Sequence, residues 1–288
     1  MISNPRVSWL GSVYKGSEPN QLYISLISIL RQNTNYSFEI VLVFDGPVSE
    51  DVKSVINSIL KISNLLKIFK LKENQGLGLA LNYGISKCKG DLIARFDTDD
   101  VNHLDRLQTQ VQYMDDHPYI SVSSTSAFEF ISSPKNKFVN CEIRKACPTN
   151  YIKFLMSIKN PVNHPTVMFR RKDVIRSDSY LNQKFFEDYL LWLRMKKNNY
   201  NFGSIMDPLV FVRVDDLYTR RYSLSYLKYE ISFIKNSFFI NRYIPIIFLP
   251  FFICRLVIRL IPNQSFQAFL RKRLKKDVCK NPDFIENL

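Results

Sequence analysis

Residues 92–100 read LIARFDTDD and carry the strongest structural signal in the chain. An apolar run ends there in three carboxylates, those of Asp97, Asp99 and Asp100. The apolar run predicts a buried strand, so the carboxylates are expected at its C-terminal end, where open α/β sheets bind their ligands. Neighbouring acids repel one another unless a cation lies among them, and a hard divalent ion, Mg²⁺ or Mn²⁺, takes oxygen ligands of this kind. The alternative is a simple strand-to-loop turn, in which Asp is a favoured residue.

Strands and helices are expected to alternate before this stretch. Strands are predicted at residues 7–14, 39–44 and 66–71, and Ser49 is predicted to cap the helix that follows the second of them. The alternation predicts an α/β fold with a Rossmann-like, mostly parallel central sheet flanked by helices. No GxGxxG follows the first strand, which argues against a dinucleotide site.

The pattern is less regular after residue 120. Short strands are expected at 120–124, 128–131 and 166–169, and an apolar helix is expected from about Phe185. Glu187 and Asp188 stand at the start of that helix, where the helix dipole stabilises acids without any catalytic role. Trp9 and Tyr14 are expected in the core rather than against a substrate.

Composition excludes several classes of protein. The chain has 288 residues and 46% apolar content, enough for a folded core. Its five cysteines form no CxxC pair and its three histidines are scattered, so neither a disulfide framework nor a zinc site is indicated. The N-terminus shows no signal-peptide pattern, which favours the cytoplasm.

The positive charge is concentrated at the C-terminal end. Residues 218–288 hold 13 Lys and Arg against 4 Asp and Glu, and contribute +9 of the net +14. Residues 238–262 are dense in Phe, Ile and Leu, but prolines interrupt an apolar run that is too short to span a bilayer. Arg255 and Arg259 recur within it at helical spacing, which predicts a helical, basic and apolar segment docked on an anionic membrane, with its basic side chains at the head groups. Nucleic acid is the less favoured partner; a helical hairpin buried against the main domain is the structural alternative.

The order of the motifs resembles glycosyltransferase family 2 with the GT-A fold, particularly its bacterial O-antigen and exopolysaccharide (amylovoran-type) members. The resemblance covers roughly residues 7–215. The motifs that carry it are SVYKG, IVLVFDGP, ENQGLGLALNYGISKCKGDLIARFDTDD, HPTVMFRR and FFEDYLLWLRM. A QxxRW motif, which processive synthases of the family carry, is missing from the sequence, and this indicates addition of a single sugar.

The resemblance implies a role for several residues. Asp45 would contact the uracil of a UDP-sugar, and Asp97 and Asp99 would form the DxD motif that binds Mn²⁺ or Mg²⁺, with Asp99 nearest the metal. Asp188 would be the catalytic base. Residues that would line the nucleotide pocket with weaker roles are Asn74, Gly76 and Arg95.

The implied reaction is consistent with these residue types. A divalent ion neutralises the charge that develops on the diphosphate leaving group, and one carboxylate takes the proton of the attacking hydroxyl. One base without a second nucleophile implies inversion at the anomeric carbon. The resemblance therefore implies transfer of one hexose or N-acetylhexosamine from a UDP-sugar to a polyprenyl-diphosphate-linked saccharide in O-antigen or capsule synthesis, with a β-linkage as the expected product.

Four further residues are candidates for contacts with the acceptor or the diphosphate: Glu187, His164, Arg220 and Arg221. A structural histidine is the alternative for His164. Residues 1–217 are expected to form the catalytic domain, with nucleotide-sugar binding in about 1–100 and the acceptor and catalytic part in about 101–217. Residues 218–288 are expected to hold the protein as a peripheral protein at the cytoplasmic side of the inner membrane.

Two other functions compete with this one. FDTDDV also fits the DxDx[TV] pattern of haloacid-dehalogenase-like phosphatases, in which Asp97 would be a nucleophile. A catalytically inactive membrane scaffold is the non-enzymatic alternative, because a fold does not determine a function. Metal-dependent UDP binding, a phosphoaspartate, or neither would distinguish the three.

Overall fold

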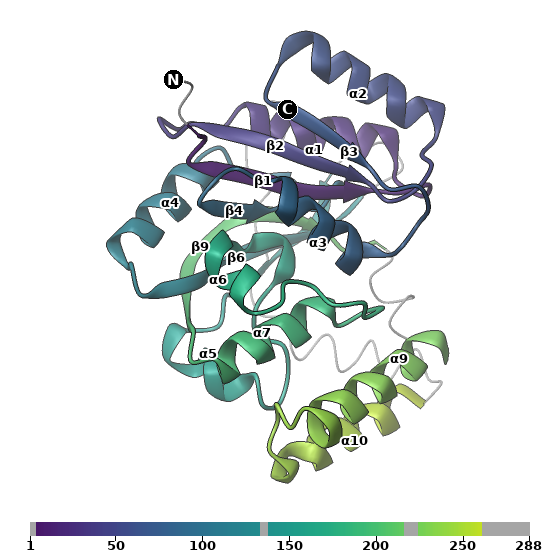
Figure 1. Ribbon diagram of the computed structural model, residues 1–288, viewed down its shortest axis with the longest axis vertical. Coiled ribbons are helices and arrows are strands. Elements are labelled where there is room, and N and C mark those ends of the chain that lie inside the picture. Colours follow the sequence, from purple (N-terminus) through teal and green to yellow (C-terminus); the bar gives the residue numbers. More distant parts are fainter. Residues whose placement is uncertain (1–3, 133–137, 216–223, 261–288) are drawn as a thin grey trace.

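The computed structural model describes residues 4–132, 138–215 and 224–260, and a single mixed sheet forms its centre (Figure 1). The strands are β1 (Val7–Val13), β2 (Phe38–Phe44), β3 (Leu66–Lys70), β4 (Leu92–Arg95), β5 (Val101–Asn102), β6 (Ile120–Ser132), β7 (Phe138–Arg144), β8 (Met168–Arg170) and β9 (Asn201–Arg213). Their order is β3-β2-β1-β4-β8-β6-β9-β5, with β7 paired to β6.

The two halves of the sheet differ in strand direction. β1 pairs in parallel with β2 and β4, and β2 pairs in parallel with β3. Beyond β4 the sheet is mixed, because β8 runs antiparallel to both β4 and β6 while β6 and β9 are parallel. The expected α/β fold is confirmed, and the Rossmann-like parallel arrangement is that of the first half.

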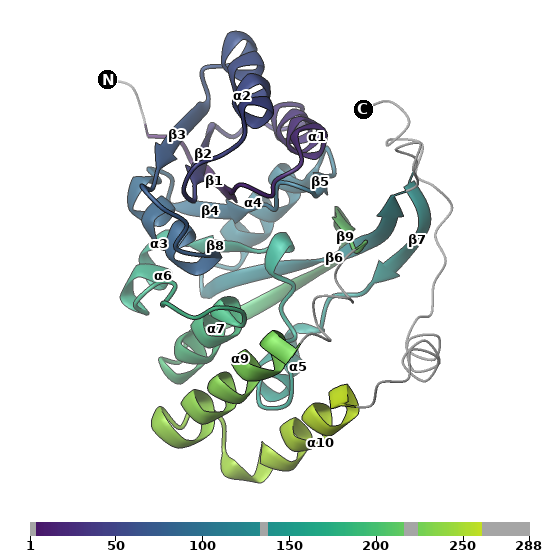
Figure 2. The ribbon, with the colours of Figure 1, turned by 90° about the vertical axis from the view of Figure 1, so that its right-hand side faces the viewer.

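Helices cover both faces of the sheet (Figure 2). They are α1 (Pro19–Leu30), α2 (Glu50–Ile62), α3 (Leu77–Lys87), α4 (Arg106–Asp116), α5 (Thr149–Leu155), α6 (Arg171–Arg176), α7 (Glu187–Lys197), α9 (Leu224–Ile234) and α10 (Leu249–Leu260), with short segments η1 (His164–Thr166), η2 (Lys235–Ile240) and η3 (Ile246–Phe248). Successive side chains of β2 explain the two layers: Leu42 packs with α1, α2 and α4, whereas Val41 and Val43 pack with α3 and α7 on the other face.

Most of the early elements agree with the sequence. The Ser49 hydroxyl accepts a hydrogen bond from the backbone N–H of Val52 at 3.3 Å and caps α2 as predicted. The strands expected at 120–124 and 128–131 are one continuous strand, β6, because their shared partner β9 is itself 13 residues long. The strand expected at 166–169 begins at Met168, since η1 occupies the residues before it.

The C-terminal helices pack on α7. The Phe233 ring of α9 stacks on Phe186 and on Tyr189, with ring centroids 4.9 Å apart in both pairs. Phe252 of α10 is fully buried beside Phe233. The described part of the C-terminal segment therefore has one face in the core, as the hairpin alternative predicts. None of the described helices combines the length and the apolarity that crossing a bilayer requires.

Candidate active site

The loop after β4 holds the three predicted acids in different environments. Asp97 is half-buried, Asp99 is exposed and Asp100 is buried. The Ser25 hydroxyl of α1 donates to the Asp97 carbonyl at 3.0 Å. At the end of β9, the Arg213 N–H donates to Asp100 Oδ1 at 2.9 Å and its Nε donates to the Asp99 carbonyl at 3.2 Å. Two elements distant in sequence therefore fix the loop at the carboxyl end of the parallel strands.

The electrostatics of this loop favour a bound cation. Loss of hydration, followed by the charge of Asp97, raises the pKa of Asp99 to about 6, even though the side chain reaches the surface. Burial, followed by the charges of Asp99 and Asp97, raises the pKa of Asp100 well above its usual value, and its buried Oδ2 has no hydrogen-bond partner in the part of the chain that the structure describes. A divalent ion would stabilise the ionised carboxylates that burial and repulsion now disfavour.

The donor set fits a metal that is shared with a ligand. Among residues 4–132, 138–215 and 224–260, no three or more His, Cys, Asp and Glu side chains are arranged to hold an ion by themselves. Mg²⁺ is commonly bound by one or two carboxylates together with substrate phosphates, and Asp97 and Asp99 could supply that protein share. Asp97 also forms an ion pair with Arg95, which leaves the exposed Asp99 as the better placed of the two.

Arg95 lies buried at the base of the loop. Its side chain is 1% exposed, and its Nε and Nη1 have no hydrogen-bond partner among the described residues. The buried Arg106 donates from Nη2 to the Arg95 carbonyl at 2.8 Å and so fixes the C-terminal end of β4. A buried guanidinium with unpaired donors is costly, and oxygen atoms of a diphosphate or a sugar would satisfy it.

Asp45 joins two loops at the same edge of the sheet. Its carboxylate accepts hydrogen bonds from the N–H groups of Gln75 (2.7 Å) and Gly76 (2.9 Å), and Asn74 Nδ2 donates to its carbonyl at 3.2 Å. A Cβ at Gly46, where φ is +82°, would lie 2.6 Å from the backbone nitrogen of Asn74, so glycine is required there. Asp45 thus anchors the loop that starts α3. Carboxylate oxygens accept more than one hydrogen bond each, so the uracil contact of Asp45 stays a prediction.

Glu187 and Asp188 begin α7 after an unusual backbone turn. Phe185 and Phe186 both adopt left-handed conformations, with φ of 57° and 58°, and each costs about 1–2 kcal/mol in a non-glycine residue. This turn explains why the helix predicted from Phe185 begins at Glu187. The rings of both phenylalanines pack on Tyr226 of α9, which helps to hold the turn.

The two acids of α7 have different surroundings. Burial, followed by the charge of Asp188, raises the pKa of Glu187 to about 8. Asn160 Nδ2 donates to Asp188 Oδ2 at 2.8 Å, and Asn160 Oδ1 accepts from the Val162 N–H at 3.1 Å, which orients the amide. Burial and the neighbouring charge therefore favour the protonated form of Glu187, while the carboxylate of Asp188 accepts the hydrogen bond of Asn160.

His164 lines the site as a neutral side chain. Its Nε2 lies 2.7 Å from the Tyr180 hydroxyl, and burial together with the charge of Arg95 lowers its pKa well below the usual value. The charge of Arg95 also affects the pKa values of Tyr180, Glu187 and Asp99. The predicted residues of β4, η1 and α7 therefore share one electrostatic site. Arg220 and Arg221 lie outside the described residues.

Sequence reasoning missed several residues of this site. Asn160 and Tyr180 lie in loops without a recognised motif, and only the fold brings them to Asp188 and His164. The expectation for Tyr14 is wrong, since this side chain is 40% exposed, next to the C-terminal end of β1; Trp9 is buried as expected. The position of Tyr14 just after a parallel strand was the available signal.

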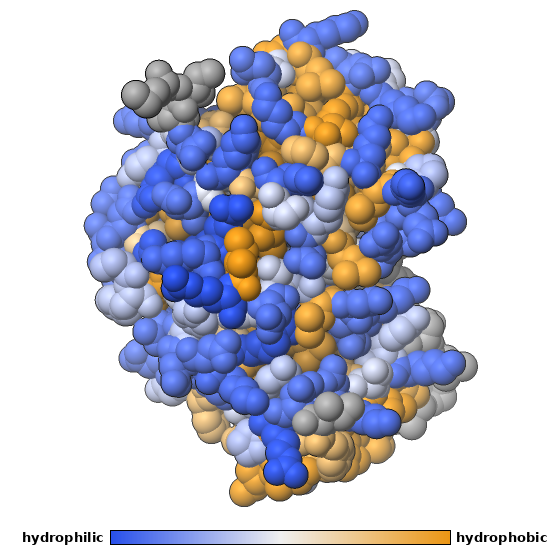
Figure 3. All heavy atoms as spheres, viewed as in Figure 1, coloured by the Kyte–Doolittle hydropathy of each residue, from blue (hydrophilic) through white to orange (hydrophobic). Residues whose placement is uncertain are grey.

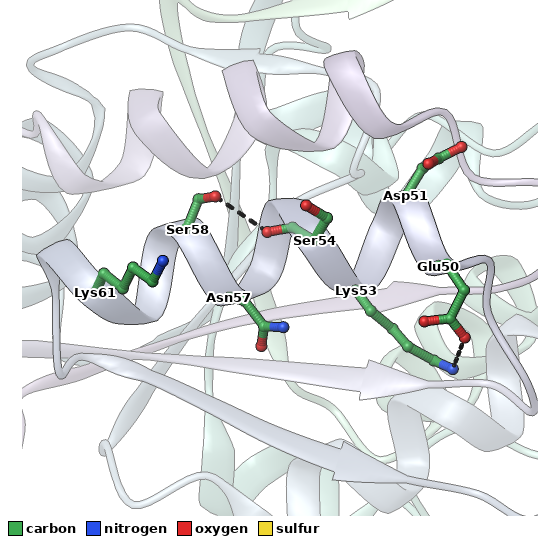
Figure 4. Close-up of a pocket in the computed structure, with 7 residues that line it drawn as sticks. All are labelled: Glu50, Asp51, Lys53, Ser54, Asn57, Ser58 and Lys61. Atoms are coloured by element: carbon green, nitrogen blue, oxygen red, sulfur yellow. Dashed lines mark hydrogen bonds and ion pairs between the residues drawn. The ribbon is translucent and has the colours of Figure 1, made fainter.

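A separate surface hollow lies on the outer side of α2 (Figure 4). Side chains of a single helix line it, and Lys53 and Glu50 form an ion pair there. None of the predicted site residues contributes to it, so the carboxylate edge is the candidate active site.

Comparison with known proteins agrees with this site. The family described as "Glycosyl transferase family 2" matches residues 13–178. The chain is 34% identical over 271 residues to "Amylovoran biosynthesis glycosyltransferase AmsE" of Erwinia amylovora, covering 93% of this chain and 99% of the relative. It is 33% identical over 273 residues to "UDP-Gal:alpha-D-GlcNAc-diphosphoundecaprenol beta-1,3-galactosyltransferase" of Escherichia coli, covering 94% and 96%.

A solved structure supports the fold independently. A mannosyltransferase of Pyrobaculum calidifontis in complex with GDP-Man and Mn²⁺ matches with a TM-score of 0.61 and 16% identity, over 90% of this chain and 71% of that one. The family match spans more than half of the chain, and the two relatives align over nearly all of it. The chain therefore belongs to glycosyltransferase family 2 and is a glycosyltransferase with the GT-A fold.

Proposed function

We propose that this protein is an inverting, metal-dependent hexosyltransferase of bacterial surface polysaccharide synthesis. It moves one hexose or N-acetylhexosamine from a UDP-sugar to a saccharide carried on a polyprenyl diphosphate. The observation that carries the proposal is the Asp188 carboxylate, oriented by Asn160 and set in one electrostatic site with the acids that follow β4. The Escherichia coli relative is named for a UDP-Gal donor and a diphosphoundecaprenol-linked acceptor, which supports the same chemical classes here.

The donor would bind at the edge formed by Asp45, Arg95 and Asp99. The unpaired nitrogens of Arg95 suit diphosphate oxygens, and Asp99 with Asp97 would hold Mn²⁺ or Mg²⁺ against the same group. The bound ion would act as a Lewis acid that neutralises the leaving diphosphate. Asn74 and Gly76 would shape the nucleotide pocket through the loop that Asp45 anchors.

The acceptor hydroxyl would be activated by Asp188. The oxygen of the acceptor hydroxyl forms a bond to the anomeric carbon, and the bond from that carbon to the UDP oxygen breaks. The proton of the acceptor hydroxyl passes to Asp188. Because the displacement is single, an α-linked donor gives a β-linkage. Glu187 stays protonated, so it can donate a hydrogen bond to the acceptor without competing as a base.

In this proposal residues 1–217 form the catalytic part and residues 218–288 hold it at the cytoplasmic side of the inner membrane, where a lipid-linked acceptor is presented. The family assignment replaces the phosphatase reading of Asp97. The assignment and the acids at positions 97, 99 and 188 argue against an inactive scaffold.

A donor screen tests the proposal. The purified chain is incubated with Mn²⁺ or Mg²⁺ and each common UDP-sugar, and release of UDP is recorded with and without a lipid-diphosphate sugar acceptor. We expect release from one donor, abolished by chelation and accelerated by the acceptor. No release from any UDP-, GDP- or dTDP-sugar would overturn the proposal, and release from a GDP- or dTDP-sugar alone would overturn its donor.

A further inference from the structure

Three segments expose large apolar side chains at the same end of the molecule. They are α5, η3 and α10, which lie at the end away from α2 in both ribbon views (Figures 1 and 2). We call this surface the apolar end face and define it by Tyr151, Phe154, Ile246, Ile247 and Phe251. Each of these side chains is 55–75% exposed. Figure 3 shows apolar residues gathered at this lower end.

Aromatic contacts make the face continuous. The ring of Phe154 on α5 meets Phe248 of η3 edge-on at 6.2 Å, and Phe248 lies 6.4 Å from Phe251 of α10. α5 belongs to the catalytic part, since it packs on β9, whereas η3 and α10 belong to the C-terminal segment. The exposed face thus crosses from one part to the other, which a docking function of the C-terminal segment alone does not predict.

Arg255 of α10 is bound within the protein by an acid of the neighbouring helix. Arg255 Nε lies 2.5 Å from Oε1 of Glu230, a fully buried residue of α9, and the guanidinium stacks over Phe252 at 4.6 Å. The expectation that Arg255 reaches lipid head groups is therefore wrong: a buried acid on the neighbouring helix binds it. Among the α10 side chains that the structure describes, the exposed ones include Phe251, Ile253 and Val257, and none of the exposed ones is charged.

The observations favour a lipid surface as the occupant. Exposed aromatic and aliphatic side chains on short helical segments suit the interface of a bilayer, where such side chains enter the head-group boundary. The chain beyond α10 carries RKRLKK at residues 271–276, which complements anionic lipids. An apolar contact combined with a polybasic stretch provides the two signals that stable membrane attachment requires.

Two elements connect the apolar end face with Asp188, the proposed catalytic base. α5 is followed directly by the loop that holds Asn160, the residue that donates to Asp188. α9, which pairs with α10 through Glu230 and Arg255, stacks on Tyr189 of the base helix through Phe233. A membrane at this face would therefore contact the elements that position Asp188.

We propose that the apolar end face inserts into the head-group region of an anionic membrane, with Tyr151 and Phe154 of the catalytic part entering beside η3 and α10. This inference rests on the proposed function, because a lipid-linked acceptor is the reason to hold the base near the bilayer. The contact fixes the orientation of the catalytic part instead of tethering it through a tail. Its apolar component resists salt, whereas attraction of the basic stretch is screened.

The test compares two double variants of the full chain. Tyr151→Ser/Phe154→Ser removes the catalytic part's share of the face. Ile62→Ser/Tyr119→Ser is the matched control, because those side chains are 64% and 63% exposed elsewhere on the surface. Binding to phosphatidylglycerol-containing vesicles is measured by sedimentation at low and high salt, and thermal unfolding and lipid-free UDP-sugar hydrolysis are recorded for every protein.

We expect the Tyr151/Phe154 variant to bind vesicles about tenfold or more weakly at both salt concentrations. The control should bind like the wild type, and both variants should unfold and hydrolyse donor normally. Unchanged vesicle binding by the Tyr151/Phe154 variant would overturn the inference and leave the basic stretch as the anchor. If the wild type were a dimer in solution and the Tyr151/Phe154 variant a monomer, the inference would be overturned, because the face would bind a second copy of the chain.

Failure of the proposed function is a distinct result. Vesicle binding that depends on Tyr151 and Phe154, in a protein that hydrolyses no nucleotide-sugar, would support the membrane contact and reject the transferase. Hydrolysis of a nucleotide-sugar by a protein whose vesicle binding does not depend on Tyr151 and Phe154 would support the transferase and reject the membrane contact.

Discussion

The two groups of acids in this molecule are close in chemistry and different in environment. Asp97, Asp99 and Asp100 follow a strand, contact Arg95 and Arg213, and include one carboxylate that reaches solvent. Glu187 and Asp188 begin a helix and are half-buried, and Asp188 accepts a hydrogen bond from the amide of Asn160.

The difference shows two ways to relieve the same repulsion. In the helix pair a proton is enough, because the raised pKa of Glu187 favours its protonated form and so reduces the repulsion from Asp188. In the strand cluster, formed by Asp97, Asp99 and Asp100, the exposed carboxylate gives access to a cation. A bound cation would reduce the repulsion among all three acids. We infer that the cluster binds the charged donor and that the pair moves a proton. The variants below test that division.

The largest expected effect is that of Asp188→Asn. It removes the ionised member of the pair and keeps its shape, so acceptor-dependent transfer should fall by about 10²- to 10⁴-fold. Binding of UDP with metal should change little, because the donor contacts lie in the strand cluster. Transfer is measured by UDP release with a lipid-diphosphate sugar, and UDP binding by calorimetry. Near-normal turnover would remove Asp188 from the role of base.

Asp99→Ala should reverse that pattern. Loss of the exposed carboxylate should weaken Mn²⁺-dependent UDP binding. It should also slow transfer, because the bound ion stabilises the transition state by several kcal/mol. Titration of UDP in the presence and in the absence of Mn²⁺ separates the metal contribution from direct contacts. If the variant bound UDP with the same dependence on Mn²⁺ as the wild type, the ion would lie elsewhere.

Much of the fold could be predicted because its signals are local. The apolar runs of β2 and β4 and the cap at Ser49 are each contained in a few residues, and the structure reproduces them. The mixed half of the sheet could not be predicted, because pairing of β6 with β8 and β9 depends on contacts between distant residues.

The site divides in the same way. Asp97, Asp99 and Asp188 stand in contiguous motifs, so the sequence could indicate them. Asn160 carries no pattern of its own, and its contact with Asp188 requires the folded loop after α5. The inward turn of Arg255 was equally hidden, because helical spacing does not reveal that the neighbouring helix offers a buried Glu230.

Asn160→Ala should have a smaller effect on turnover than Asp188→Asn or Asp99→Ala. A hydrogen bond to a charged group contributes about 1.5–3 kcal/mol, so turnover should fall about tenfold and the acid limb of its pH profile should move up by about one unit. The shift follows because the amide stabilises the ionised form of Asp188. Asn57→Ala, on the outer side of α2, is the matched control and should change neither quantity. A tenfold loss with an unmoved pH profile would indicate that Asn160 only supports the fold.

Glu187→Gln should have the smallest effect, on stability more than on activity. The pKa of Glu187 rises from 4.5 in the unfolded chain to about 8 in the folded one, so the folded protein binds more protons between these values. Its free energy of unfolding should therefore decline as pH rises through that window, by at most about 1.4 kcal/mol per unit for one proton. The variant cannot ionise, so urea unfolding at pH 5, 6.5 and 8 without metal or nucleotide should show a flatter decline. Asp188→Asn should flatten it only in part, because it removes the neighbouring charge and leaves the burial. An equal slope in the wild type and Glu187→Gln would mean that the pair does not hold the proton, and the contrast with the strand cluster would then be lost.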